Sequence, residues 1–170
     1  MTIWITQNGS ELAQGDLLPE CAVAMVGADF APTLGELTIV AEVRDLIVIT
    51  QSCDLANSKA RFAALCPIHR LDDFERANPD FTKSRWELVR KGRVEGLHLL
   101  GSPEDPQNNR RALVVDFREI YSLPVGYLAT HAAQHGDRWR LRSPYLEHFS
   151  QAFARFFMRV GLPVQIPEFK

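Results

Sequence analysis

The segment from residue 44 to residue 70 constrains the fold more than any other part of the sequence. Two runs rich in Ile, Val, Leu and Ala lie on either side of a polar stretch, residues 52–59. Short apolar runs with β-branched residues, bounded by polar residues, are typical of strands. We therefore predict an antiparallel β-hairpin. With Gln51 opposite Ala60, the register of antiparallel strands places Arg44 opposite approximately Pro67.

The predicted register separates two groups of polar residues. Arg44 comes close to His69 and Arg70 at the open end of the hairpin. Cys53 and Asp54 lie at the tip, roughly 20 Å away at about 3.3 Å per residue. The two ends of the hairpin are therefore expected to have different roles.

This separation argues against two kinds of site. A thiol nucleophile at Cys53 with His69 as its base requires hydrogen-bond contact between the two. A zinc site of Cys53, Cys66 and His69 requires all three ligands around one ion, and their spacing matches no common zinc motif. We expect Cys66 and Cys21 to be small buried hydrophobic residues in strands. Asp54 is expected either to cap backbone N–H groups at the tip or to belong, with Cys53, to a functional loop.

Arg44 and His69 together suggest chemistry on a phosphodiester. An imidazole can accept a proton from a ribose 2′-hydroxyl. A guanidinium can hold the scissile phosphate and the charge that develops on it. The alternative interpretation is structural: Arg44 pairs with Asp45, Glu42 or another surface carboxylate, and His69 caps the helix that follows.

The remaining pattern predicts a small, mainly β fold of the α+β type. Further strands are expected at residues 21–27, 37–43, 96–100, 112–117 and 138–141, beside 46–51 and 61–67 of the hairpin. A helical insertion covers about 70–92, with a capping box at Ser84 and Glu87. We expect one domain over residues 1–170, built as an antiparallel barrel of about six strands with a C-terminal helix.

The C-terminal helix, about residues 143–160, has the clearest boundaries. Ser143 is a suitable N-cap, Pro144 a suitable first residue, and Gly161 a suitable stop. Its aromatic side chains recur at helical spacing, which predicts a core-facing stripe. The stripe contains Phe149, Phe153, Phe156 and Phe157.

Other ionisable residues give weaker indications. Asp116, Arg118 and Glu119 follow an apolar strand and are expected to form a structural salt-bridge set, with a role at a catalytic rim as the alternative. His98 lies in an apolar strand and is expected to be a core or rim residue. The polar stretch 130–137, which contains two more histidines, predicts a solvated loop.

Composition excludes several classes of protein. The chain has 170 residues, is 46% apolar and 24% charged, and has no apolar run of the roughly 20 residues that a membrane helix needs. Its start does not resemble a secretory signal. A net charge of −2 argues against non-specific coating of nucleic acid. Three separated cysteines predict free thiols in a reducing, cytoplasmic compartment.

The order of these features resembles the MazF/PemK family of toxin endoribonucleases. Five short motifs carry the likeness: Gly15-Asp16, the arginine and apolar strand of 44–50, the Pro-Ile-His of 67–69, the aspartate and arginine of 113–118, and the Val-Gly-Leu of 160–162. The likeness spans about residues 14–162. Asp45 stands where the family has proline, and His69 where it has its active-site threonine.

This resemblance implies an SH3-like barrel that cleaves single-stranded RNA without a metal ion or other cofactor. It implies a homodimer, with an antitoxin or another protein as partner and no membrane association. Arg44 and His69 are then the expected catalytic residues. The expected binding residues are Thr50, Cys53, Asp54, Arg70, Asp116 and Arg118. The acidic pI and the replaced threonine favour an alternative, a non-catalytic SH3-like module that binds a protein partner in a bacterial or phage defence system.

Overall fold

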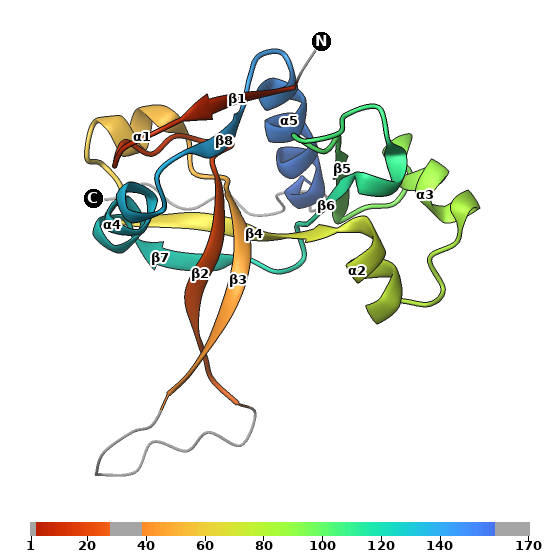
Figure 1. Cartoon of the computed structure of the whole chain (residues 1–170), viewed down its shortest axis with the longest axis horizontal. Coiled ribbons are helices and arrows are strands. Elements are labelled where there is room, and N and C mark those ends of the chain that lie inside the picture. Colours follow the sequence, from red (N-terminus) through yellow and green to blue (C-terminus); the bar gives the residue numbers. More distant parts are fainter. Residues whose placement is uncertain (1–2, 28–38, 159–170) are drawn as a thin grey trace, which may run out of the picture.

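The computed structural model describes residues 3–27 and 39–158 of the chain (Figure 1). Strands and helices alternate along it. In chain order they are β1 (Trp4–Gln7), β2 (Leu17–Met25), β3 (Val40–Val48), α1 (Ser52–Ala56), β4 (Phe62–Arg70), α2 (Leu71–Ala77), α3 (Lys83–Arg90), β5 (Leu97–Leu100), the 3₁₀ helix η1 (Asn109–Arg111), β6 (Leu113–Asp116), β7 (Tyr121–Pro124), α4 (Val125–His135), β8 (Arg138–Leu141) and α5 (Tyr145–Phe157).

Two antiparallel sheets organise the described strands. The larger sheet has the order β2-β3-β4-β6-β5, and β7 also pairs with β4. β1 pairs with β8, and a single bridge between Asp16 and Arg140 links this pair to the start of β2. The predicted α+β class with antiparallel sheets is confirmed. The sheet is open, however, and the predicted closed SH3-like barrel is not confirmed.

The predicted β3–β4 hairpin is present, but its register differs by two residues. Leu46, and not Arg44, lies opposite Pro67, and Val48 lies opposite Leu65. The predicted register treats the connection as a symmetric turn. The connection instead contains the helix α1, so the chain before and after the helix contributes unequal numbers of residues to it. β3 is also one continuous strand where two were expected, at 37–43 and 46–51; residues 37 and 38 lie outside the described part.

β3 and β4 separate soon after they pair. Beyond Leu46 and Pro67, β3 continues beside β2, with Arg44 opposite Cys21. β4 continues beside β6, with His69 opposite Val114. In Figure 1 the β2–β3 ribbon accordingly swings away from the body while β4 runs on towards α2. The result is a notch between the two strands.

Alternation along the strands distributes the apolar side chains between two faces. Leu46 and Leu65 point into a cluster covered by α4, which contributes Leu128. Ile47 points into a second cluster that holds Phe149 of α5. A third cluster forms where α2 and α3 pack beside β5 and β6; it contains Phe74, Trp86, Val89, Leu97 and Val114. The notch lies on the same sheet face as the first and third clusters.

The helices agree with the sequence prediction only in part. The insertion 70–92 contains two helices, but α3 begins at Lys83 with Thr82 as N-cap, so the capping box at Ser84 is wrong. α5 has Pro144, and not Ser143, at its N-cap. The expected loop at 130–137 is also wrong, because most of it is helical. His131 and His135 both belong to α4.

The aromatic stripe of α5 packs largely as predicted. Phe149 is buried, and Phe153 and Phe156 pack against the second cluster. Phe157 departs from the prediction, since 53% of its surface is exposed. No helix in the ranges 3–27 and 39–158 is long and apolar enough to cross a membrane.

Candidate functional site

The notch between β3 and β4 gathers the residues to which the sequence pointed. It encloses about 220 Å³ and opens where the two strands part. Arg44 and Asp45 line its β3 side, and His69 and Arg70 line its β4 side. Asp73, from the first turn of α2, closes one end. The two-residue change in register places Arg44 and His69 at the same level of the two strands, just beyond the point where β3 and β4 part.

One donor of Arg44, Nε, is not used by any residue that the structure describes. Its terminal nitrogen Nη2 forms an ion pair with Glu42, two residues back along β3, as the structural alternative anticipated. Its Nε is buried and has no hydrogen-bond partner within residues 3–27 and 39–158. A buried donor without a partner costs about 1–3 kcal/mol. A site that binds an acceptor from outside the chain would recover that cost.

Burial favours the neutral form of the His69 imidazole. Burial lowers its pKa below the ordinary 6.5, with Arg44 acting in the same direction, while Asp116, Glu119 and Asp45 act against it. Its ring packs on Phe74 of α2, with centroids 5.7 Å apart. It does not cap α2, because that helix has no side-chain cap. A neutral imidazole can accept a proton at neutral pH.

A tyrosine and a glutamate border the arginine on the sheet. Tyr121 opposite Leu65 donates its hydroxyl hydrogen to Glu119. Burial and this hydrogen bond raise the pKa of Tyr121 to about 12, although Arg44 acts to lower it. Tyr121 therefore remains protonated at any physiological pH. Sequence analysis missed it, because a single tyrosine in a short strand carries no distinctive pattern.

The carboxylates around the notch are already engaged. Asp45 accepts a hydrogen bond from the backbone N–H of Glu20 at 2.9 Å. Asp73 pairs with Arg76, and Asp116 with Arg118. Arg70, in contrast, is exposed and forms no ion pair with any described residue. Among the charged side chains of the notch, the arginines, Arg44 and Arg70, therefore still have hydrogen-bonding atoms that no described residue uses.

The other predicted site residues lie elsewhere. Thr50 accepts a hydrogen bond from the backbone N–H of Ala64 at 2.7 Å, which ties the end of the hairpin together. Cys53 and Asp54 belong to α1, at the far end of β4 from His69. Asp54 does not cap the connection, since α1 has no side-chain cap.

Asp116 and Arg118 form the salt bridge that was expected. Arg118 Nε donates to Asp116 at 2.8 Å, and the carboxylate is buried. Glu119 bonds to Tyr121 instead of joining this pair. Asp116, Arg118 and Glu119 therefore form a rim of paired groups near His69. The charges of Asp116 and Glu119 both act to raise the pKa of His69.

The free thiols behave as predicted. Cys21 and Cys66 are buried, and burial raises the pKa of each to about 12. Cys53 is exposed. No group of three or more His, Cys, Asp or Glu side chains in the described part of the chain is arranged to hold a metal ion.

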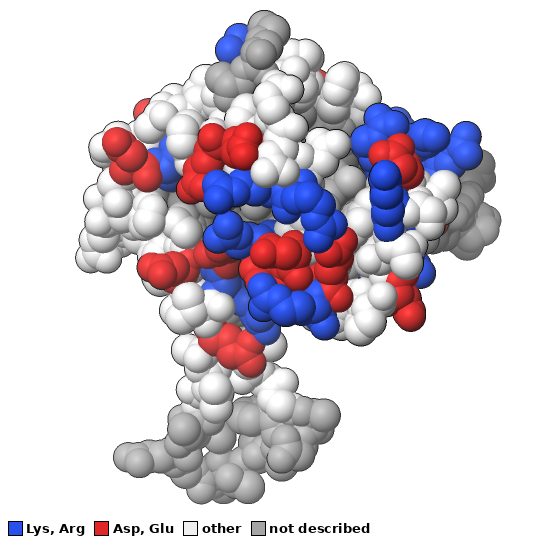
Figure 2. Space-filling view, turned by 45° about the vertical axis from the view of Figure 1, so that its right-hand side comes forward, with Lys and Arg blue, Asp and Glu red and all other residues white. Residues whose placement is uncertain are grey.

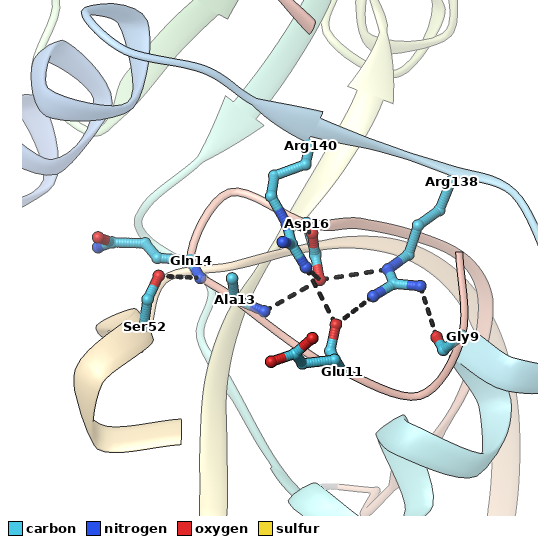
Figure 3. A network of polar contacts seen from close by, with 8 residues as sticks. All are labelled: Gly9, Glu11, Ala13, Gln14, Asp16, Ser52, Arg138 and Arg140. Carbon is cyan, nitrogen blue, oxygen red and sulfur yellow. Dashed lines mark hydrogen bonds and ion pairs between the residues drawn. The ribbon is translucent and has the colours of Figure 1, made fainter. Parts of the chain in front are cut away.

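A second polar cluster surrounds Asp16 (Figure 3). Arg138 and Arg140 both donate to its carboxylate, Arg138 from Nε at 3.2 Å. Arg138 also donates to the carbonyl oxygens of Gly9 and Glu11. Both side chains of the Asp16–Arg138 pair are fully buried. This cluster joins residues more than 120 positions apart and holds the N-terminal loop against β8.

The backbone conformation and the packing at residue 15 explain why a glycine precedes Asp16. The φ of Gly15 is +83°, in the left-handed region that favours glycine. A Cβ there would also lie 2.9 Å from the Cβ of Leu141. The Gly15-Asp16 pair that contributes to the family resemblance is thus explained by packing, and it makes no contact with the notch.

The surface is not uniformly basic. On the face in Figure 2, arginines and carboxylates are interleaved. Several charges of the described residues are ion-paired, among them Arg110 with Glu75, Arg76 with Asp73 and Arg90 with Glu87. Such a face does not provide the continuous cationic surface that non-specific nucleic-acid binding uses.

Comparison with known proteins gives no relative from which function could be transferred. No protein-family model matches the chain, and no curated protein matches it significantly. The geometry of the notch is therefore the basis on which a function can be proposed.

Proposed function

We propose that this protein is a metal-independent endoribonuclease that cleaves single-stranded RNA at the notch, as a divergent toxin or conflict-system enzyme of MazF/PemK type. One observation carries the proposal: Arg44, with its buried and unpartnered Nε, lines the same notch as His69, an imidazole whose neutral form burial favours. A phosphodiester supplies the acceptor that Nε lacks. Arg70 adds a second cation at the same opening.

The reaction follows from these groups. His69 accepts the proton of a ribose 2′-hydroxyl, and the 2′ oxygen attacks the adjacent phosphorus. The bond from phosphorus to the 5′ oxygen breaks, leaving a 2′,3′-cyclic phosphate. Water protonates the departing 5′ oxygen, and His69 returns its proton to solvent. Arg44 stabilises the charge that builds on the non-bridging oxygens.

The test is an RNA cleavage assay in EDTA. Purified wild-type protein is incubated with a long single-stranded RNA beside Arg44→Ala, His69→Ala and the control Arg61→Ala, an exposed arginine just before β4. Arg44→Ala should lose roughly a hundredfold in rate, because it removes one preorganised donor. His69→Ala should lose about 10²–10⁴-fold, because it removes the general base.

The products and the control separate the outcomes. Arg61→Ala should match the wild type, and a DNA of the same sequence should stay intact because it lacks the nucleophile. Equal cleavage by all four proteins would identify a contaminating nuclease. Absence of cleavage at micromolar enzyme would remove the enzymatic proposal and leave the second candidate.

The second candidate is a protein-binding module, and the β2–β3 ribbon favours it. The ribbon projects from the body (Figure 1). One of its faces carries Ala22, Ala24, Ala41 and Val43, all exposed, and Val43 is 65% exposed. Contiguous exposed apolar side chains mark interaction surfaces. We propose that a second copy of the chain covers this face, which would give the homodimer expected from the resemblance.

Light scattering tests this candidate independently of any activity. The wild type should have the mass of a dimer at micromolar concentration. Val43→Asp should be a monomer, since it replaces the largest side chain of the apolar face with a charge. Thr130→Asp, an exposed change on α4, is the control and should remain dimeric. A monomeric wild type would exclude the ribbon as a dimer interface.

A further inference from the structure

A larger cavity lies directly beside the notch. It has a volume of about 360 Å³, within the range of pockets that bind small molecules. Its walls come from β2, β3, β4, β6, β8, the end of α4, η1 and the loop before η1. We call it the β8 pocket, after the strand that contributes Trp139 and Arg138.

The β8 pocket and the notch share part of their lining. Asp45, Ile68 and Arg70 line both of them. His69 and Arg70 are consecutive on β4, so their side chains leave the strand on opposite faces. A chain that passes through the notch from His69 therefore meets Arg70 next and the β8 pocket beyond it.

Two groups in the β8 pocket are free to bind a ligand. Arg70 has no ion-pair partner among residues 3–27 and 39–158. Trp139 is half-buried and packs by one side on the second apolar cluster. Arg111 is engaged only loosely, by a 3.7 Å contact to the exposed Glu104. Arg138 is not available, because Asp16 and two carbonyl oxygens occupy its donors.

These groups fit one chemical class of ligand. An indole offers a flat face on which any nucleobase can stack. Arginines hold phosphate through paired N–H donors. Glu104 and Asp137 offer carboxylate oxygens that can accept from base amino groups. A pocket with an aromatic wall, a free arginine and acceptors at its edge matches a nucleotide better than a fatty acid or a metal ion.

We propose that the β8 pocket binds one nucleotide unit of a single-stranded RNA, with its base stacked on Trp139 and its phosphate held by Arg70. The inference deepens the proposed function, on which it rests for the identity of the whole substrate. It assigns substrate positioning to the β8 pocket and bond cleavage to the notch. Arg70 lines both cavities and positions the part of the RNA that passes from one to the other.

Calorimetric titration with the four nucleoside 5′-monophosphates tests the proposal directly. Ribose 5-phosphate and inorganic phosphate are titrated in parallel, because they carry the phosphate without the base. The monophosphates should bind tighter than either. Trp139→Leu should weaken them by about five- to a hundredfold, through loss of stacking. Trp139→Phe should retain most of the affinity, since it keeps an aromatic face.

Variants of the arginines distinguish this proposal from the proposed function. Arg70→Gln should weaken binding about tenfold, while Arg61→Gln should leave it unchanged. Binding that persists in a protein without cleavage would retain the nucleotide pocket and overturn only the ribonuclease.

Three results would overturn the nucleotide pocket itself. One is equal affinity for ribose 5-phosphate and for the monophosphates. Another is equal affinity of wild type and Trp139→Leu. The third is binding of an acidic peptide, displaced by no nucleotide, which would make the cavity a protein-docking site.

Discussion

The Asp16 cluster and the notch use similar residues under opposite conditions. At Asp16, two arginines surround one carboxylate, and backbone carbonyls accept from their remaining nitrogens (Figure 3). At the notch, Arg44 shares one carboxylate, keeps a buried Nε without a partner, and lies near the unpaired Arg70.

The comparison separates stability from binding. A buried charge is tolerated only when partners replace the water that it lost. The Asp16 cluster meets that condition within the chain, so its contribution is to the fold. At the notch, the buried Nε of Arg44 lacks such a partner among the described residues. We therefore expect an acceptor from outside the chain to bind there. Substitutions in the two regions should therefore change different measured quantities.

The largest effect is expected at Asp16. Asp16→Asn leaves the buried Arg138 without its counter-charge, which should lower the free energy of unfolding by about 3–5 kcal/mol. Urea unfolding followed by circular dichroism measures this. Asp80→Asn, at an exposed position, is the matched control and should stay within about 0.5 kcal/mol of wild type. Equal stability of the two variants would remove the structural role of the cluster.

The next effect concerns His98, a histidine inside a packed region. Burial, and to a lesser extent His148, lowers its pKa to about 4, and its ring stacks on Phe117. Between pH 6.5 and 4 the unfolded chain therefore binds a proton that the folded chain does not. Stability from this group is complete above pH 6.5 and falls by up to about 3 kcal/mol as the pH drops through 4.

His98→Phe should remove that part of the acid sensitivity. The urea midpoint of each protein is measured at pH 7 and at pH 4.5. The change in midpoint between the two pH values is then compared between the wild type and His98→Phe, and the part that differs is due to His98. Parallel losses of stability in the two proteins would show that His98 is not the group responsible.

A smaller effect on stability is expected for Arg44→Ala. The variant loses an ion pair between half-exposed side chains, which contributes about 0–1 kcal/mol, and removes an unpartnered buried donor. The two changes oppose each other, so stability should stay within about 1 kcal/mol of wild type while cleavage falls. A loss as large as that of Asp16→Asn would place Arg44 among the structural residues.

The smallest effect is a displacement of the pH–rate profile. Burial is the main cause that lowers the pKa of His69 below 6.5, so the neutral base is already populated at slightly acidic pH. Cleavage should rise with pH, with a midpoint below 6.5, and be level at pH 7. Initial rates on one RNA across this range give the midpoint. A midpoint above 6.5 would mean that the surrounding carboxylates, and not burial, control His69.

Local pattern was sufficient where one element carries its own signal. The apolar runs of β3, β4 and β6 and the aromatic stripe of α5 identify strands and helix, because each must bury one face. The thiols of Cys21 and Cys66 were identified as core residues for the same reason. Pattern failed for α4, whose buried face is only Leu128 and Ala132 within a polar stretch.

The amino-acid sequence by itself determined the strands β2 to β6 and β8, the helical insertion and α5, and that Arg44 and His69 share one end of a hairpin. Only the tertiary structure decided the register, the open sheet and the notch. The register depends on how α1 connects β3 to β4, and an open or closed sheet depends on strand tilt and stagger, which no local pattern encodes. The notch exists because β3 continues along β2 while β4 continues along β6. Contacts between distant segments produce that divergence, so it can be read only from the folded chain.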